Sequence, residues 1–352
     1  MHPSYSHILI CRTDNIGDVV LTLPLAGYLK SLYPGIRIDF LCSAYAASVV
    51  SNCRFVDQVI VLETLEDPAA YFARESFDTI IFAFPHRRLA LAARKAGVKN
   101  RVGNSHRLFH WFTCNKLAHF SRARSALHEA QLNFALLRPM GIHYTPPLAA
   151  IPALFGLSAP RQVAIDALFS AAPFNLILHP KSNGSGREWP LGHYTQVAQR
   201  LLPYPNICVW ITGSAAEAIA IAQEAAPLLA LPNVQSVCGK FDLESLTALI
   251  GACDGLVASG TGPLHMSAAL GRPTLGLFPP AKSINPARWG TLGEQGQTLC
   301  LVKCGGGCHD GATCACMRGI TPEQVVAVIL EWNRKKMDTA PEHALVDVQV
   351  AG

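Results

Sequence analysis

The chain of 352 residues is long enough for about two domains, at roughly 150 residues each. Half of its residues are hydrophobic and only 15% are charged, which excludes a disordered chain and indicates a globular protein with a net charge of +5. No apolar run reaches the ~20 residues that span a bilayer, and the N-terminus lacks the basic and apolar regions of a secretory signal. We therefore expect a cytoplasmic protein.

The first half of the chain alternates short apolar strands with helical stretches. We predict strands at His7–Cys11, Ile36–Leu41, Gln58–Leu62, Thr79–Phe84 and, as a shorter fifth, Val98–Val102. A helix over Ala126–Leu137 ends at the sequence RPMG, and the Pro-rich stretch His143–Pro160 is typical of an interdomain linker.

The second half repeats the alternation. We predict strands at Phe174–His179, Ile207–Thr212, Val234–Val237, Gly255–Ser259 and Thr274–Leu277. Helices fit Leu191–Leu202, Ala215–Leu229, Leu243–Ala252, Gly262–Leu270 and Pro322–Arg334. Two such series predict an α/β protein of two Rossmann-like, doubly wound domains facing a central cleft: an N-terminal domain at 1–150, a C-terminal domain at 151–335 and a loose tail at 336–352.

The loop after the first strand, in CRTDNIGDVVLTLPL, carries two carboxylates where phosphate binding would be expected. It contains neither G-x-G-x-x-G nor G-K-S/T. Asp14 and Asp18 would repel a phosphate. Asp18 fits a helix N-cap, and it also fits a general base aimed into the cleft; the two roles are compatible because a capping residue is rigidly held.

Two later loops have the composition of phosphate sites. In HPKSNGSGREWPLGHY, Lys181, Ser182, Ser185 and Arg187 could surround a diphosphate, although a flexible surface loop anchored by Trp189 is an equal alternative. In SGTGPLHMSAALGRP, a strand ends at glycines and a helix begins, which favours a phosphate or nucleotide-sugar cradle over an empty tight turn.

Two single residues near these loops have alternative roles. His265 fits a packed helix residue or a hydrogen-bond donor behind the site, and a metal ligand is disfavoured because no partner ligands are apparent. Glu217, early in the helix after ITGS, could accept from a ribose hydroxyl, but the residues alone favour a surface glutamate that interacts with the helix dipole.

Positive charge is concentrated in one segment. Residues 79–128 contain ten Lys or Arg and no Asp or Glu, whereas the remaining chain has 19 basic and 24 acidic residues. This segment predicts a local anion-binding surface.

Twelve cysteines are present, and five of them crowd into Cys300–Cys316 together with His309. We favour a compact reduced loop. The alternative is a structural zinc or iron site, with Cys304, Cys308, Cys314 and Cys316 as candidate ligands.

Taken in order, these motifs resemble those of the ADP-heptose:lipopolysaccharide heptosyltransferases, glycosyltransferase family 9. The similarity covers I-x-K/R-x-x-x-x-G-D-V-V-L-T-L-P, H-P-x followed by K/R-x-W-P, and S-x-T-G-P-L-H-x-A-A-A-L-G-x-P-T. LHEAQLNFALLRPMGI and the Cys-rich segment before the last helix also resemble the family, so the resemblance extends from about His7 to Trp332.

The resemblance implies a GT-B fold, with the acceptor on the N-terminal domain and the ADP-sugar on the C-terminal domain. It implies an inverting transfer without a metal ion or other cofactor. Asp18 would be the general base and Arg187 would neutralise the leaving diphosphate. The predicted donor-binding residues are Thr13, Gly17, Lys181, Ser182, Glu217, Thr261, Gly262 and His265.

The implied acceptor is anionic inner-core lipopolysaccharide on the cytoplasmic face of the inner membrane, which makes the protein a peripheral one. The predicted acceptor-binding residues are Arg87, Arg88, Arg101 and Arg107. The neighbouring Phe109, Trp111, Phe112 and Phe120 suit an anionic amphiphile at a membrane. The same composition suits single-stranded nucleic acid, which no other feature supports, so we expect no nucleic-acid partner.

Two motifs depart from the family, and in the first loop Asp14 and Asn15 replace the serines that members often have. Well-known members have D-T-G-L-x-H where this chain has Gly260-Thr261-Gly262-Pro263-Leu264-His265. This lost carboxylate leaves alternatives open: a different nucleotide sugar, a protein acceptor, or a homologue that binds sugar nucleotide or lipopolysaccharide without transfer.

Overall fold

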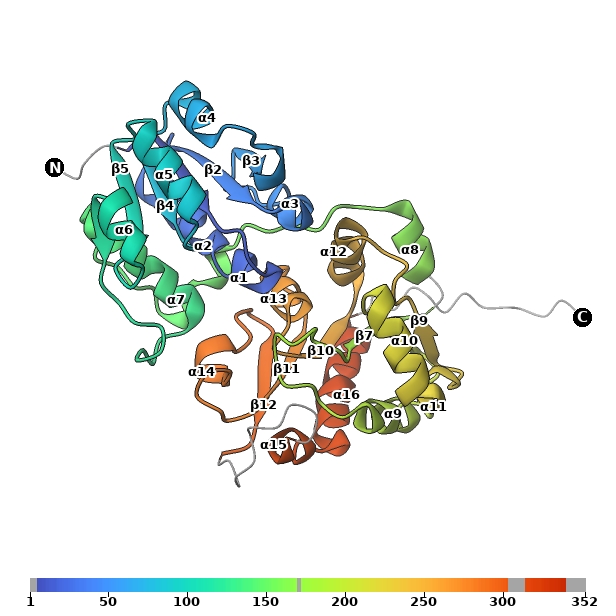
Figure 1. Cartoon of the computed structure of the whole chain (residues 1–352). Coiled ribbons are helices and arrows are strands. Elements are labelled where there is room, and N and C mark those ends of the chain that lie inside the picture. The colour runs from blue at the N-terminus through green and yellow to red at the C-terminus, as the bar shows by residue number, and fades with distance from the viewer. Residues whose placement is uncertain (1–4, 170–171, 303–313, 340–352) are drawn as a thin grey trace, which may run out of the picture.

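The computed structural model describes residues 5–169, 172–302 and 314–339, which form two α/β domains facing each other (Figure 1). Each domain is built on a six-stranded sheet whose described strands all pair in parallel. This architecture confirms the predicted fold class of two doubly wound domains.

The N-terminal sheet has the strand order 3-2-1-4-5-6, which is typical of dinucleotide-binding folds. Its strands in spatial order are β3 (Gln58–Val61), β2 (Arg37–Cys42), β1 (His7–Cys11), β4 (Thr79–Phe82), β5 (Asn100–Asn104) and β6 (Lys116–Ala118). Ile8 pairs with Ile38 on one side and with Thr79 on the other, so the strand order reverses between β1 and β4.

The C-terminal sheet repeats this order. Its strands in spatial order are β12 (Gly296–Cys300), β11 (Thr274–Phe278), β10 (Gly255–Ser259), β7 (Phe174–His179), β8 (Ile207–Ile211) and β9 (Val234–Ser236). The reversal here lies between β7 and β10.

Helices connect the strands in both domains. The N-terminal helices are α1 (Ile16–Val20), α2 (Leu23–Leu32), α3 (Ala44–Val50), α4 (Pro68–Glu75), α5 (Arg87–Lys95), α6 (Leu108–Thr113) and α7 (Glu129–Phe134). The C-terminal helices are α8 (Val163–Phe169), α9 (Leu191–Arg200), α10 (Ala215–Glu224), α11 (Ala226–Leu229), α12 (Leu243–Ala252), α13 (Gly262–Ala269), α14 (Pro286–Trp289), α15 (Ala315–Arg318) and α16 (Pro322–Thr339). Among the described residues, none of these helices combines the length and the apolar character that crossing a membrane requires.

Apolar residues predominate in the central strands because helices cover both faces of each sheet. In β1, Ile8, Leu9 and Ile10 are fully buried, and every residue of β7 is buried. The predictions for β1, β7 and β10 match the observed bounds.

Two edge strands were not predicted. β6 has the sequence KLA and β12 has GQTLC, and both lie at the margins of their sheets, where Ala118 is buried in β6 and no residue is buried in β12. Without burial on both faces the sequence carries no apolar run.

Two predicted helices differ in extent from the observed ones. The helix expected from Ala126 starts at Glu129, because His128 and Gln131 form a capping box, and it tightens into a 3₁₀ helix over Ala135–Met140 that contains Pro139. The helix expected over Ala215–Leu229 is broken at Ala225, where the backbone leaves the helical region before the short α11.

The Pro-rich stretch predicted as a linker contacts the N-terminal domain. Leu157 forms an antiparallel bridge with Cys53, and the Ser158 amide donates to the carbonyl of Asn52 at 3.1 Å. The predicted tail at 336–352 is corrected at its start, because α16 continues through Thr339; residues 340–352 lie outside the described part of the chain. The boundary at 150/151 stays a prediction.

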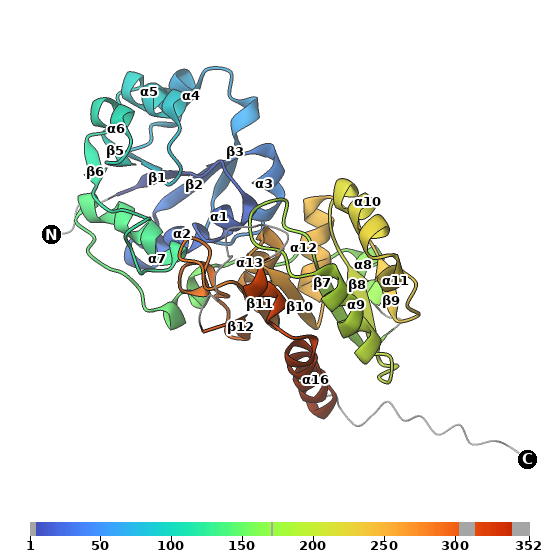
Figure 2. The same ribbon diagram turned by 60° about the horizontal axis from the view of Figure 1, so that its bottom comes forward.

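The two domains touch through α1 and α13, which lie at the centre of both views (Figures 1 and 2). A Cβ on Gly262 would lie 2.2 Å from Ile16 Cγ2, and a Cβ on Gly17 would lie 2.9 Å from His265 Cδ2. Glycine at these two positions therefore permits the close approach of the helices.

Candidate functional site

The loops after β1, β4, β7 and β10 meet between the domains. Ligands of open α/β sheets bind at the carboxyl edge of the strands, where the strand order reverses. Asp14 and Asp18 follow β1, the loop 180–189 follows β7, and Gly260 to Gly262 follow β10. The fold thus brings together the three stretches that the sequence singled out.

Asp18 lines two cavities along this junction. The central pocket, about 170 Å³, is bordered by Asp18, Arg187 and Thr261. The N-terminal pocket, about 440 Å³, is bordered by Asp18, Arg107 and Arg288. Asp18 therefore separates a pocket facing the C-terminal loops from a pocket rich in arginine.

A third cavity, the C-terminal pocket of about 710 Å³, opens beside the central pocket. Its wall includes Gly17 from the N-terminal domain and Ser182, Glu217 and Thr261 from the C-terminal domain. Its size suits a nucleoside-sized group next to the glycine-rich loops.

Asp18 lies in the first turn of α1 and is not the N-cap of that helix. The helix begins at Ile16, and Asn15, with extended backbone angles, occupies the cap position. The interpretation of Asp18 as an N-cap is therefore wrong. Its carboxylate instead accepts from the guanidinium of Arg12, and Thr22 Oγ1 donates to its backbone carbonyl at 2.8 Å.

Arg12 holds both carboxylates of the first loop. Its Nε donates to Asp14 Oδ1 at 2.6 Å and its Nη2 donates to Asp14 Oδ2 at 2.9 Å, while Nη2 also contacts Asp18. The Arg12 side chain is almost completely buried. The orientation of Asp18 thus depends on a buried arginine that the sequence analysis did not single out.

The pKa of Asp18 is raised to about 6. Burial is the main cause; the positive charge of Arg12 opposes it, whereas the carboxylates of Asp14 and Glu129 add to the rise. At neutral pH the Asp18 carboxylate is therefore ionised and able to accept a proton.

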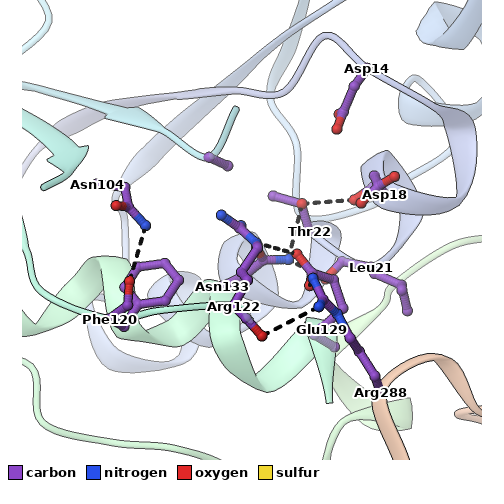
Figure 3. Close-up of polar contacts among 12 residues, drawn as sticks. Asp14, Asp18, Leu21, Thr22, Asn104, Phe120, Arg122, Glu129, Asn133 and Arg288 are labelled. Atoms are coloured by element: carbon purple, nitrogen blue, oxygen red, sulfur yellow. Dashed lines mark hydrogen bonds and ion pairs between the residues drawn. The ribbon is translucent and has the colours of Figure 1, made fainter. Parts of the chain in front are cut away.

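Glu129 bridges the two domains beside Asp18. Figure 3 shows its carboxylate between Arg122, 2.7 Å away on the N-terminal domain, and Arg288, 3.1 Å away on the C-terminal domain. Burial favours the neutral acid, but Arg122 and then Arg12 and Arg288 outweigh it and lower the pKa of Glu129. The glutamate is therefore an anion shared between the domains.

An amide connects this bridge to the backbone of α1. Arg122 Nη2 donates to Asn133 Oδ1 at 3.3 Å, and Asn133 Nδ2 donates to Thr22 Oγ1 at 3.2 Å (Figure 3). Thr22 Oγ1 in turn donates to the carbonyl of Asp18 in α1. Glu129 and Asn133 lie within the motif LHEAQLNF, but the motif alone did not indicate a role for either residue. No sequence pattern indicated a role for Arg288.

Two buried histidines lie at the same interface. His128 Nε2 donates to the carbonyl of Gly290 at 2.9 Å, and its Nδ1 accepts from the Ala130 amide. Burial lowers the pKa of His128 to about 4, and burial, with His128 adding to it, lowers the pKa of His265 to about 3. Both imidazoles are therefore neutral, and that of His265 borders the central pocket.

The loop after β7 is held in a tight turn. Asn183 and Gly184 have φ values of 45° and 78°, a conformation that asparagine and glycine tolerate best. Ser182 is buried; its amide donates to Glu188 Oε1 at 2.9 Å and its Oγ to the carbonyl of Gly186 at 2.9 Å. Arg187 follows at the edge of the central pocket. This loop is therefore an ordered part of the site.

Lys181 points its charge away from the three pockets. Its Nζ lies 3.1 Å from Glu224 and 3.4 Å from Glu188, and it lines none of the three cavities. Its predicted role in donor binding stays a prediction.

The loop after β10 is packed too tightly for a side chain at Gly260. A Cβ there would lie 2.8 Å from Phe278 Cε1, and Ser185 Oγ contacts the Gly260 carbonyl at 3.4 Å. Thr261 is buried at the N-cap of α13, and its Oγ1 has no hydrogen-bond partner among the described residues. Gly262 then begins the helix.

Glu217 takes part in the cap of α10. The Ser214 amide donates to Glu217 Oε2 at 2.7 Å, and the Glu217 amide donates to Ser214 Oγ at 3.2 Å. The residue also lines the C-terminal pocket. Its structural role and its predicted contact with a ribose are compatible.

The four predicted acceptor arginines do not gather in one place. Arg107 lines the N-terminal pocket, whereas Arg88 donates to the carbonyls of Leu65 and Glu66. Arg101 donates to the carbonyls of Val98 and Thr113. Arg87 is exposed at the start of α5.

The structure bears only partly on the predictions for Thr13 and for the cysteine cluster. Thr13 is half-buried and lines none of the three cavities. Cys314 and Cys316 are buried, while Cys304 and Cys308 lie outside the described residues. Within the described part of the chain no group of three His, Cys, Asp or Glu side chains could hold a metal ion, so the metal alternative for the cysteine cluster stays untested.

Comparisons with known sequences agree on one protein family. The model of glycosyltransferase family 9 (heptosyltransferase) matches residues 72–311. A Haemophilus influenzae protein provisionally named a glycosyltransferase is 27% identical over 300 residues, which are 82% of this chain and 86% of that protein. Lipopolysaccharide heptosyltransferase 2 of Escherichia coli K12 is 24% identical over 301 residues, which are 78% of this chain and 83% of that protein.

Solved structures share the two-domain fold. The E. coli ADP-heptose lipopolysaccharide heptosyltransferase II has a TM-score of 0.71 at 18% identity, covering 94% of this chain and 99% of that one. A family 9 glycosyltransferase of Veillonella parvula has a TM-score of 0.74 at 20% identity, covering 95% and 99%. An E. coli heptosyltransferase solved with ADP has a TM-score of 0.65 at 18% identity, covering 93% and 99%. The expected GT-B fold is thus confirmed.

Proposed function

The chain belongs to glycosyltransferase family 9, the heptosyltransferase family, and from this premise we propose that it transfers heptose from ADP-L-glycero-D-manno-heptose to the inner core of lipopolysaccharide. The proposed reaction is a single displacement with inversion at the anomeric carbon. Asp18 is its general base, and no step is assigned to a metal ion.

One observation carries this proposal: Asp18 borders both the central and the N-terminal pocket. A base must reach the acceptor hydroxyl while that hydroxyl faces the anomeric carbon of the donor. Among the described residues, Asp18 is the one carboxylate that lines both of these cavities.

In the proposed step, an acceptor hydroxyl in the N-terminal pocket gives its proton to the Asp18 carboxylate. The hydroxyl oxygen forms a bond to the anomeric carbon of the sugar in the central pocket. The bond from that carbon to the phosphate oxygen breaks, and its electron pair leaves with ADP. A pKa of about 6 keeps Asp18 ionised at neutral pH while leaving it more basic than an exposed aspartate.

The leaving diphosphate requires positive charge at the central pocket. Arg187 and the N-terminus of α13, with Thr261 and Gly262, border the central pocket there. The helix dipole and a guanidinium both stabilise the negative charge that develops on the leaving group. The neutral imidazole of His265 adds no competing charge.

ADP occupies the C-terminal pocket in this proposal. Glu217 faces that cavity and can accept a hydrogen bond from a ribose hydroxyl, and the backbone of Gly17 closes the cavity from the other domain. The E. coli heptosyltransferase solved with ADP, which shares this fold, supports a nucleotide of this kind.

The acceptor occupies the N-terminal pocket. Four arginines border it (Arg12, Arg107, Arg122 and Arg288) together with three carboxylates (Asp14, Asp18 and Glu129), so the arginines exceed the carboxylates by one. The surplus positive charge favours an acceptor that carries carboxylates or phosphates, as the inner core does. Together with the basic segment 79–128, it supports a peripheral protein at the cytoplasmic face of the inner membrane.

A second candidate function is transfer of a different sugar from its nucleotide. Phe278 leaves no room for a carboxylate at position 260, where the family motif has one. Phe278, Pro279, Ile284 and Trp289 give the central pocket an apolar wall. A sugar with fewer hydroxyl groups to satisfy would suit this wall.

The test is calorimetric titration with ADP-heptose, ADP-glucose and UDP-glucose, followed by transfer assays with a heptose-deficient core saccharide. We expect selective binding and transfer of ADP-heptose, and Asp18→Asn should retain binding but lose transfer. Preference for another donor would support the second candidate. Binding without transfer to any core saccharide would reject the proposed acceptor and leave a protein acceptor or a binding-only homologue.

A further inference from the structure

Helix α6 presents large apolar side chains to the surface of the N-terminal domain. Leu108 is 75% exposed, Trp111 is 54% exposed and Phe112 is 67% exposed, whereas His110 and Thr113 are buried. A surface helix normally turns polar residues outward, so this helix has the opposite character. These three exposed residues are called the α6 patch below.

The α6 patch is held in a fixed orientation. Trp111 Nε1 donates to the carbonyl of Ser105 at 2.8 Å, and Arg94 Nη1 donates to the carbonyl of Phe112 at 2.7 Å. His110 Nδ1 lies 2.9 Å from the carbonyl of Asn104, beneath the helix. The side chain of Trp111 and the backbone of the helix at Phe112 are therefore held in place.

The structure separates the aromatic residues of the basic segment into two groups. Phe109 packs against the buried cluster beneath α5, and Phe120 packs against the other core of the domain. Trp111 and Phe112 remain outside, and Leu108 joins them. Figures 1 and 2 both show α6 beside α5, on the side of the N-terminal domain away from the C-terminal domain.

The positive charge around the α6 patch favours an anionic partner. The patch lies within residues 79–128, which contain ten basic and no acidic residues, and Arg107 occupies the N-cap of α6. Two copies of this face would bring like charges together, whereas an anionic bilayer would neutralise them. Tryptophan and phenylalanine next to arginine are typical of protein surfaces that bind at the lipid headgroup level.

The patch also adjoins the acceptor side of the site. Arg107 and His106, directly before α6, line the N-terminal pocket that Asp18 borders. A membrane in contact with α6 would therefore lie beside the entrance used by the acceptor.

We propose that α6 inserts Leu108, Trp111 and Phe112 into the surface of an anionic lipid bilayer, so that a lipid-anchored acceptor reaches the N-terminal pocket from the membrane. The delivery of the acceptor rests on the proposed function. The binding of the bilayer does not depend on it.

The test uses the full chain and vesicles without any substrate. Sedimentation is measured with vesicles of phosphatidylcholine containing about one third phosphatidylglycerol, and with phosphatidylcholine alone. The test variant is Leu108→Ser/Trp111→Ser/Phe112→Ser. The matched control, Val163→Ser/Leu202→Ser/Ile219→Ser, removes three exposed apolar side chains from the C-terminal domain.

We expect the wild type and the control to bind anionic vesicles, more weakly at high salt, and the test variant to lose at least about tenfold in partitioning. Transfer to an acceptor embedded in vesicles should fall in parallel, while transfer to a delipidated core saccharide stays unchanged. Absence of wild-type binding, or equal binding by the test variant, would overturn the proposal. Concentration-dependent self-association that only the test variant loses would assign the patch to a second copy and overturn it as well.

Vesicle binding and transfer are measured separately, so the two proposals can fail independently. Lipid binding without any heptosyl transfer would reject the proposed function alone. Far-UV circular dichroism and urea unfolding of the test variant check that the domain still folds.

Discussion

The raised pKa of Asp18 predicts a pH dependence that an ordinary aspartate would not give. With a pKa of about 6, close to nine tenths of the carboxylate is ionised at pH 7 but only about one tenth at pH 5. Since the base acts in its ionised form, kcat/KM should fall about tenfold over this range. An aspartate at its usual pKa would lose only about 6% of its ionised form.

The perturbation that tests this cause is Asp14→Asn. The Asp14 carboxylate raises the pKa of Asp18 and shares the guanidinium of Arg12. Its removal should lower the pKa of Asp18, shift the midpoint of the profile to lower pH and increase activity at pH 5, by at most about tenfold because the ionised fraction cannot exceed one. Asp166→Asn, on the surface of α8 and remote from the pockets, is the matched control.

The assay is kcat/KM between pH 4.5 and 8 (about four points per pH unit) with ADP-heptose and a delipidated core saccharide. A profile that stays flat from pH 7 to pH 5 would refute the assignment of the base. If the midpoint of the pH profile in Asp14→Asn moves to higher pH or does not move, the Asp14 carboxylate does not raise the pKa of Asp18.

Three further outcomes are expected. In steady-state kinetics, Arg187→Ala should lower kcat at least about tenfold, because Arg187 borders the central pocket. Lys181→Ala should change kcat less than about threefold, because the Lys181 ammonium group is paired with two glutamates; similar losses in both variants would contradict this difference. Glu129→Gln should lower the free energy of unfolding in urea by about 3 kcal/mol, because Arg122 and Arg288 lose their shared anion. A change below about 1 kcal/mol would contradict this prediction and would mean that water solvates the two arginines in place of the carboxylate. Gly260→Ala should cost about 1–3 kcal/mol in the same assay, and Phe278→Leu in the same chain should recover part of the loss; additive effects would argue against the contact.

The sequence was most informative where burial is complete. The strands β1, β7 and β10 are flanked by other strands and covered on both faces, so a short stretch rich in apolar residues marks each of them. β6 and β12 lack this constraint at the sheet margins, and their sequences carry no corresponding pattern. The loops at the carboxyl ends were predictable for the same reason, because each follows a well-marked strand.

The side-chain partners within the site were not predictable. Glu129 and Arg288 are separated by 159 positions in the chain and meet only because the domains face each other. The density of arginine in residues 79–128 indicated an anion-binding surface but not which arginines border the pocket. Arg88 and Arg101 are used by nearby carbonyl groups, while Arg107 borders the pocket.

The glycine contact between α1 and α13 has a mechanical consequence. Gly17 and Gly262 directly adjoin Asp18 and Thr261, so one place at which the domains touch is also the place at which base and phosphate cradle meet. If one domain rotates about this contact, the displacement of each of its atoms grows with the distance of the atom from the contact. Opening of the wider N-terminal pocket by such a rotation would break the ion pair between Glu129 and Arg288, while the short lever arm would hold the reacting groups nearly at constant separation.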